Sequence, residues 1–94
     1  MNSLPPVELL EATHVFPGKF VFKAIGRHHD GFVDGVVAAV RHGLGQEFDP
    51  PFELNQTAHG RHVAVTIEPC VDSAEQVLVI YERLRHVDGL VLLL

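Results

Sequence analysis

The fold of this chain is decided by residues 16–26, FPGKFVFKAIG. The Pro-Gly pair at positions 17 and 18 is a turn signal. Residues 19–25 are rich in β-branched and aromatic side chains, which favour a β-strand. Gly26 is expected to end that strand. The stretch therefore predicts where a single domain over residues 16–94 begins, after an N-terminal arm over residues 1–15, and it contains no catalytic motif.

Two helices are predicted downstream of this strand. The spacing of apolar side chains over residues 32–44 indicates a helix with Asp30 as its N-cap and Gly45 as its stop. Four valines weaken its helix propensity, and a strand over residues 33–40 is the alternative. Ser73 followed by Gln76 matches a capping box, which predicts that the second helix begins there.

Three further strands complete the pattern, over residues 52–57, 61–68 and 90–94. The order is therefore β-α-β-β-α-β, which folds as two split β-α-β units with right-handed crossovers. Strands 19–25 and 61–68 lie in the centre of such a sheet. We predict an α/β fold, an α+β sandwich of the ferredoxin-like type. It has a four-stranded antiparallel sheet of order 4-1-3-2 and both helices on one face.

Composition and charge exclude several classes of function. Seven basic and twelve acidic residues give a formal charge of −5, which opposes binding to nucleic acid or anionic lipid. The single cysteine, Cys70, allows no internal disulfide and no Cys-x-x-Cys motif, as expected in a reducing compartment. The longest apolar run, residues 90–94, is too short to cross a bilayer. We expect a soluble cytoplasmic protein with no nucleic-acid or membrane partner.

Enzymatic activity finds little support in the residue pattern. Acylphosphatases share the predicted architecture and use an arginine in the first loop, where this chain has Arg27, with an asparagine on a later strand. The strand over residues 61–68 contains no asparagine. RNA-recognition modules stack bases on aromatic side chains of the central strands, where this chain carries His62, Ala64 and Thr66. We therefore predict a protein without catalytic residues, without a cofactor and without an RNA ligand.

Five of the seven histidines are predicted to gather at one end of the sheet, beside the first loop, the hairpin and the last turn. They are His28, His29, His59, His62 and His86. Imidazoles are common Zn²⁺ ligands, and a His-x-x-His spacing places two of them around a turn. A metal-responsive binding protein is therefore the alternative function. The simpler interpretation is a set of solvated loop residues.

The sheet face away from the helices, together with the last strand, is the predicted interface. Residues 90–94 are apolar on both faces yet form an edge, where natural proteins usually place charge, proline or a bulge. The opposite edge, over residues 52–57, has two prolines before it and looks protected. We expect a homodimer or another protein partner, with the N-terminal arm over the same surface as the alternative. The predicted interface residues are Val21, Lys23, Ile25, Leu90, Val91, Leu92 and Leu93, and Lys23 and Glu68 are expected to pair on the open face.

A family resemblance covers residues 9–94. Its motifs are Phe16-Pro17, Phe20-x-Phe22-Lys23-x-Ile25-Gly26, Gly60 leading into Val65-x-Ile67, Gln76-Val77 and Ile80-Tyr81-x-x-Leu84. They resemble the uncharacterised bacterial YbeD-like family, although that family usually has an aromatic residue where His62 stands and valine where Ala24 stands. The resemblance implies a ferredoxin-like fold similar to the amino-acid-binding regulatory domains of the ACT type, without an established activity.

By the same resemblance, a small-molecule effector would bind at the first loop of a dimer. The residues concerned are Gly26, Arg27, His28, His29 and Asp30. A simpler reason for Gly26 is a turn with positive φ. We therefore predict a non-catalytic regulatory or protein-interaction module.

Overall fold

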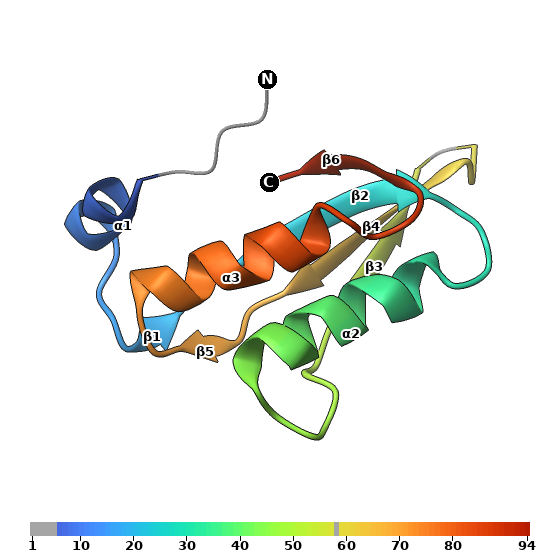
Figure 1. Cartoon of the computed structure of the whole chain (residues 1–94). Coiled ribbons are helices and arrows are strands. Elements are labelled where there is room, and N and C mark those ends of the chain that lie inside the picture. The colour runs from blue at the N-terminus through green and yellow to red at the C-terminus, as the bar shows by residue number, and fades with distance from the viewer. Residues whose placement is uncertain (1–5, 58) are drawn as a thin grey trace.

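A four-stranded antiparallel sheet with two helices on one face forms the body of this computed structural model (Figure 1), which describes residues 6–57 and 59–94. The sheet order is β3-β4-β2-β6. This is the order predicted from the sequence, with the strand of the opening motif in the centre. The four strands are β2 (Phe22–Arg27), β3 (Glu53–Gln56), β4 (His62–Ile67) and β6 (Leu90–Leu93).

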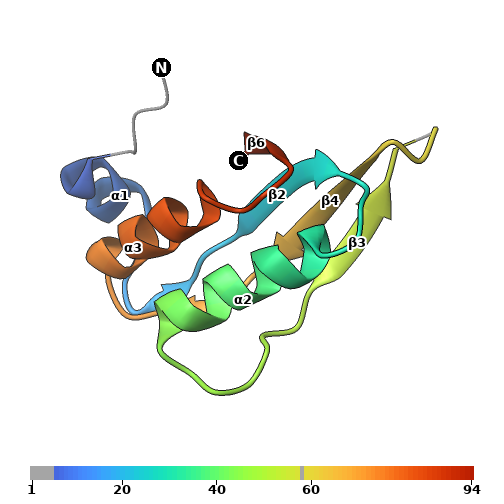
Figure 2. The ribbon, with the colours of Figure 1, turned by 45° about the vertical axis from the view of Figure 1, so that its right-hand side comes forward.

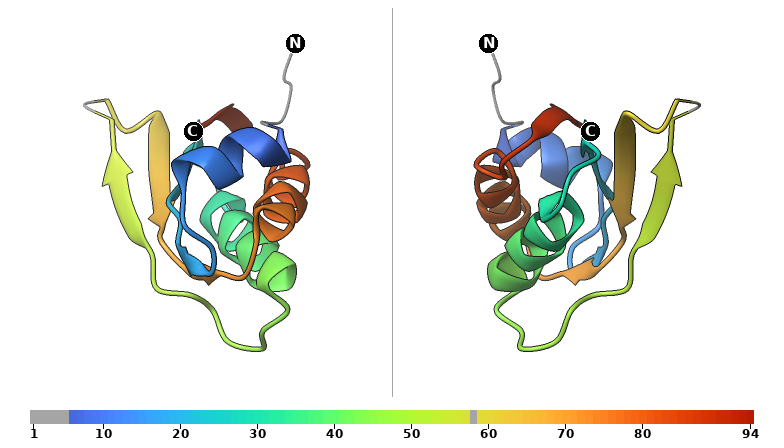
Figure 3. Two further views of the ribbon diagram at one scale, coloured as in Figure 1. Left: turned by 90° about the vertical axis from the view of Figure 1, so that its left-hand side faces the viewer. Right: turned by 90° about the vertical axis from the view of Figure 1, so that its right-hand side faces the viewer.

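Helices α2 (Phe32–Leu44) and α3 (Ala74–Leu84) pack against each other over one face of the sheet (Figure 3). The valine-rich segment is thus helical, and its alternative as a strand is wrong. Gly31, with φ of 93°, caps α2 in place of the expected Asp30, whose side chain makes no capping bond. Gly45 ends the helix as predicted, with φ of 70°.

Helix α3 begins at the predicted cap. Ser73 Oγ accepts a hydrogen bond from the backbone N–H of Gln76 at 3.2 Å. The side-chain oxygen of Gln76 accepts one from the backbone N–H of Asp72 at 2.7 Å. Two free donors at the start of the helix are satisfied in this way.

The opening stretch forms two strands and not one. Strand β1 (Gly18–Lys19) pairs with β5 (Cys70–Val71) in a separate two-stranded sheet, and β2 then runs to Arg27. The stretch is divided because its first part bonds to a different partner from its second part. The backbone N–H of Phe20 donates to the carbonyl of Pro69 at 3.0 Å, outside the main sheet. Gly26 therefore lies within a strand and does not end it.

The described part of the N-terminal arm is helical. Helix α1 (Val7–Thr13) packs against α3, with Leu10 buried in the core and Val7 against it (Figures 1 and 2). These two side chains are three residues apart and share one side of the helix. The alternative that the arm covers the open face is wrong for its described residues, because α1 lies on the helical side, and residues 1–5 of the arm lie outside the described residues.

The core lies between the sheet and the two helices. Every second side chain of the central strands points into it. The alternation of the sequence predicts that Phe22 and Ala24 of β2 face the core, together with Val63, Val65 and Ile67 of β4. In the structure these side chains point toward the helices. The fully buried side chains from β4, α2 and α3 include Val63, Val65, Ile67, Val36, Val40, Val77, Ile80 and Leu84. The predicted inward faces of both central strands are confirmed.

Gly26 is buried because the first residue of α2 packs on it. Its φ is not positive, so a turn does not explain the glycine. A Cβ atom at this position would overlap the ring of Phe32 and would lie 2.7 Å from the carbonyl oxygen of Gly89. The missing side chain thus lets α2 and the turn before β6 close on the centre of the sheet.

We expect Gly26→Ala to lower the free energy of unfolding by about 1–3 kcal/mol, the range for inserting atoms into a packed core. Urea denaturation followed by circular dichroism measures the change. Adding Phe32→Leu relieves one of the two overlaps, so the double variant should lose less stability than the sum of the single variants. Strict additivity of the two changes would contradict the proposed contact.

Tyr81 provides a spectroscopic test of the packing between α3 and the sheet. Its ring meets those of Phe20 and Phe22 edge-on, at centroid distances of 6.2 and 5.3 Å. Burial raises the pKa of Tyr81 above the ordinary tyrosine value of 10.0, because the charged phenolate is poorly solvated there. The chain has one tyrosine and no tryptophan, so its absorbance reports this site alone.

We expect the tyrosinate absorbance to appear at higher pH in the folded protein than in urea. Because the unfolded phenol ionises first, Tyr81 should make stability fall as pH rises from 10.0 through the folded-state pKa. Tyr81→Phe should remove that part of the pH dependence. Identical titration curves with and without urea would contradict the burial of this ring.

Candidate interaction surfaces

The loop after β2, the hairpin between β3 and β4 and the turn before β6 lie at one end of the sheet, as predicted (Figure 2). His28 joins the first two of these segments. Its backbone N–H donates to the carbonyl of Arg61 at 3.0 Å, and its ring Nδ1 lies 3.2 Å from the carbonyl oxygen of Gly60. Its Nε2 lies 3.5 Å from the side-chain nitrogen of Gln56. His28 therefore closes the loop onto the hairpin.

Two other histidines of this end, His29 and His86, have partners different from those of His28. The ring of His29 lies 2.7 Å from the carbonyl oxygen of Asp30 and 3.4 Å from that of Asp88. His86 Nε2 lies 3.4 Å from a carboxylate oxygen of Glu82, on α3. Within residues 6–57 and 59–94, no three side chains of His, Cys, Asp or Glu are placed to hold a metal ion. The five predicted histidines do not form a ligand set among these residues, and the rings of His28, His29 and His86 are turned to different neighbours.

The predicted effector residues do not share one environment. Gly26 is buried behind Phe32, whereas the four residues that follow it, 27–30, are exposed. Arg27 lies opposite His62 in the β2–β4 pairing. Only the four exposed residues are available to a ligand, and the effector site stays a prediction.

The open face of the sheet has an apolar centre. Ile25 lies between Ala64 of β4 and Leu92 of β6, and all three side chains point away from the helices. Lys23 lies beside Thr66 on the same face. Among the described residues, the ion pairs do not include the expected one between Lys23 and Glu68.

Strand β6 forms one edge of this face, and Leu94 continues its pairing with β2. The backbone of Leu94 exchanges two hydrogen bonds with Lys23, at 2.8 and 3.2 Å. Neighbouring residues of a ladder alternate, so the backbone N–H and C=O of Leu93 point to the outer edge. The exposed fractions of Val91, Leu92 and Leu94 are 57%, 48% and 56%.

Two of the four residues predicted as interface on β6 are exposed, and the interface itself stays a prediction. Leu90 and Leu93 are partly buried against the core, because they lie on the helical side of the strand. Val91 and Leu92 are at the surface, and Val91 lies at the β-bulge. Val21 is exposed just before β2, outside the ladder. The sequence interpretation did not include Leu94, which is also exposed, although its place at the end of an apolar run was a usable signal.

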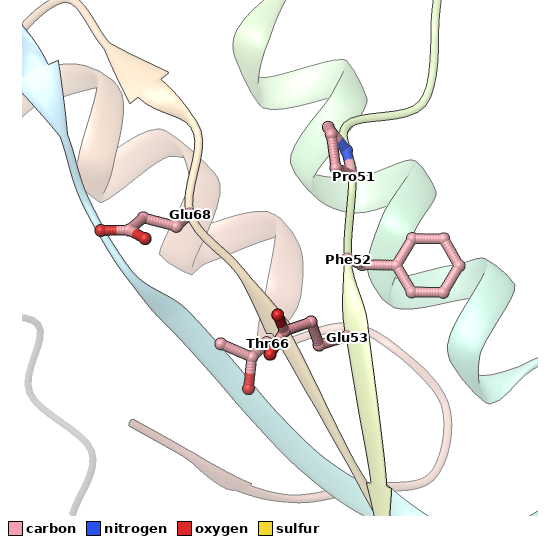
Figure 4. Close-up of a pocket in the computed structure, with 5 residues that line it drawn as sticks. All are labelled: Pro51, Phe52, Glu53, Thr66 and Glu68. Atoms are coloured by element: carbon pink, nitrogen blue, oxygen red, sulfur yellow. The ribbon is translucent and has the colours of Figure 1, made fainter.

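A second surface lies at the opposite edge, on β3. A shallow hollow of about 340 Å³ is lined by Pro51, Phe52, Glu53, Thr66 and Glu68 (Figure 4). The ring of Phe52 points toward α2, away from the two carboxylates. The sequence interpretation treated this edge as protected. The signal it missed is a set of aromatic and aliphatic residues, Phe48, Phe52 and Leu54, all of which are exposed.

The helices of the described ranges are too short to serve as membrane spans, since none offers a sufficiently long apolar stretch.

The described ion pairs lie on the helical layer, away from the open face. Arg41 of α2 bonds Asp49 at 2.6 Å, and Glu82 of α3 bonds Arg85 at 2.9 Å.

Comparison with known proteins identifies a family but no activity. Residues 11–94 match the family described as "Protein of unknown function (DUF493)". A UPF0250 protein of Shewanella sp. strain ANA-3 is 30% identical over 82 residues, which cover 87% of this chain and 86% of the relative. A UPF0250 protein of Pasteurella multocida strain Pm70 is 31% identical over 74 residues, which cover 79% of this chain and 82% of the relative. The resemblance to the YbeD-like family is thereby confirmed, and the chain belongs to the DUF493, or UPF0250, family of uncharacterised bacterial proteins.

Proposed function

We propose that this protein is a non-catalytic interaction module of the ferredoxin-like type that forms a homodimer through the edge of β6. One observation carries the proposal: residues 90–94 form a sheet edge without a charge or a proline, and three of their side chains are about half exposed. Such an edge is a ready template for another strand. The bulge at Val91 lies at its start and leaves the pairing of Leu92 with β2 regular.

A symmetric dimer satisfies this edge. Two copies of β6 running antiparallel would pair the outward backbone groups of Leu93 and join the two sheets into one. On the open face, Leu92 and Ile25 would then form one continuous apolar surface with the same two residues of the partner. Association would remove exposed apolar surface of both copies from contact with water, which favours the dimer.

The regulatory part of the proposal concerns the first loop. The backbone N–H of Arg27 donates to the carbonyl of Gly89 at 3.0 Å, so the loop begins next to the start of β6. Antiparallel pairing of two β6 strands would place each loop beside the end of the partner's β6. This geometry supports a small effector at residues 27–30 of an ACT-type dimer, as the family resemblance implies.

We expect multi-angle light scattering to give the wild-type protein twice the 10.4 kDa mass of one chain. Leu92→Lys should give the mass of a monomer, because two lysines would be buried near each other at the two-fold axis. Leu9→Lys is the matched control: Leu9 lies on α1 and is 52% exposed, against 48% for Leu92.

Circular dichroism is the check that both variants are folded. If Leu92→Lys is not folded, Leu94→Lys replaces it. A monomeric wild-type protein would overturn the proposal. So would a folded β6 variant that keeps the dimer mass.

A further inference from the structure

Strand β3 leaves a row of backbone groups without partners in the sheet. Among the described strands it pairs with β4 alone, and all four of its residues are exposed. The N–H of Thr57 donates to the carbonyl of His62 at 3.0 Å. This bond shows which residues of β3 have their backbone groups turned toward β4. Because bonded residues alternate along an edge, the N–H and C=O groups of Leu54 and Gln56 point away from β4.

One face of this edge is apolar. Leu54 lies opposite the buried Val65, so its side chain is on the helical side of the sheet, and Phe52 shares that side. Their exposed fractions are nevertheless 49% and 43%. The reason is that α2 packs over β2 and β4, and β3 stands outside the helical layer (Figure 3).

The other face of the same edge is acidic. Glu53 and Glu68 line the hollow of Figure 4, on the open face. Neither carboxylate belongs to an ion pair of the described chain. Pro51 lies before the strand and removes no backbone donor from Glu53–Gln56. The edge is thus open to pairing, with different chemistry above and below it.

We propose that β3 is a docking edge for an extended segment of another protein in which apolar and basic side chains alternate. Successive residues of an added strand point to opposite faces, so the two residues beside Phe52 and Leu54 would be apolar. The residue beside Glu53 would then point to the open face as a lysine or arginine, next to the hollow that Glu68 lines.

Charge decides between this partner and a second copy of the chain. Pairing β3 with β3 would bring two sets of Glu53 and Glu68 together on one face, and the chain carries a formal charge of −5. Like charges across a strand pair are destabilising. A basic segment neutralises the same carboxylates. The docking edge is distinct from β6 and does not depend on the dimer.

Fluorescence anisotropy tests the proposal with a labelled peptide of alternating lysine and valine. The control peptide has the same composition with its lysines and valines in two separate blocks. We expect the alternating peptide to bind about tenfold tighter, because only its pattern places charge and apolar surface on opposite faces of a strand. Equal affinities would show attraction by charge alone and would overturn the proposal.

Protein variants locate the binding site. Glu53→Lys should weaken binding of the alternating peptide about tenfold, since it opposes like charges at the edge. Glu11→Lys makes the same change in net charge on the exposed surface of α1 and should leave the affinity nearly unchanged. Equal losses in the two variants, or none in Glu53→Lys, would overturn the proposal.

Amide hydrogen exchange by NMR identifies the edge directly. Saturation with the alternating peptide should slow exchange of the Leu54 and Gln56 amides, which point outward in the free protein. Unchanged exchange at both positions would overturn the docking mode. Slowed exchange at Leu93 in their place would assign the peptide to the β6 edge and would also overturn it, while leaving the proposed dimer to its own test.

Discussion

The contact between Gly26 and Phe32 sets the geometry on which the rest of the molecule depends. Phe32 is the first residue of α2, and its ring occupies the space where Gly26 of the central strand has no side chain. The same glycine pairs with Leu90, and the carbonyl oxygen of Gly89 lies beside the same space that the ring of Phe32 fills. One close approach therefore positions the start of α2 and the start of β6 relative to the centre of the sheet.

The surfaces follow from that arrangement. Two helices of this length cover β2 and β4 on one face, which leaves the other face and both edges to the solvent. Helix α1 does not change this, because Leu10 directs it to α3 on the helical side.

The sheet order and several local features could be predicted from the sequence, whereas the details set by particular distant contacts could not. The alternation of Val63, Val65 and Ile67 fixed the inward face of β4, and Ser73 marked the start of α3. The break before β2 could not be predicted, because the acceptor for the N–H of Phe20 is Pro69, far along the chain. The packing of Gly26 and the exposure of Leu54 likewise depend on where α2 lies.

The two edges differ in a way that bears on their partners. On β6 the side chains that reach the surface are aliphatic, so two copies can meet without bringing like charges together. At the β3 edge, the carboxylates of Glu53 and Glu68 oppose pairing with a second copy of β3 and favour a basic segment. In the proposed dimer, β6 would pair with its own copy while β3 would repel its own copy, so the sheet would not grow without end. The chemistry of each edge, more than the shared backbone pattern, therefore determines what can be added to it.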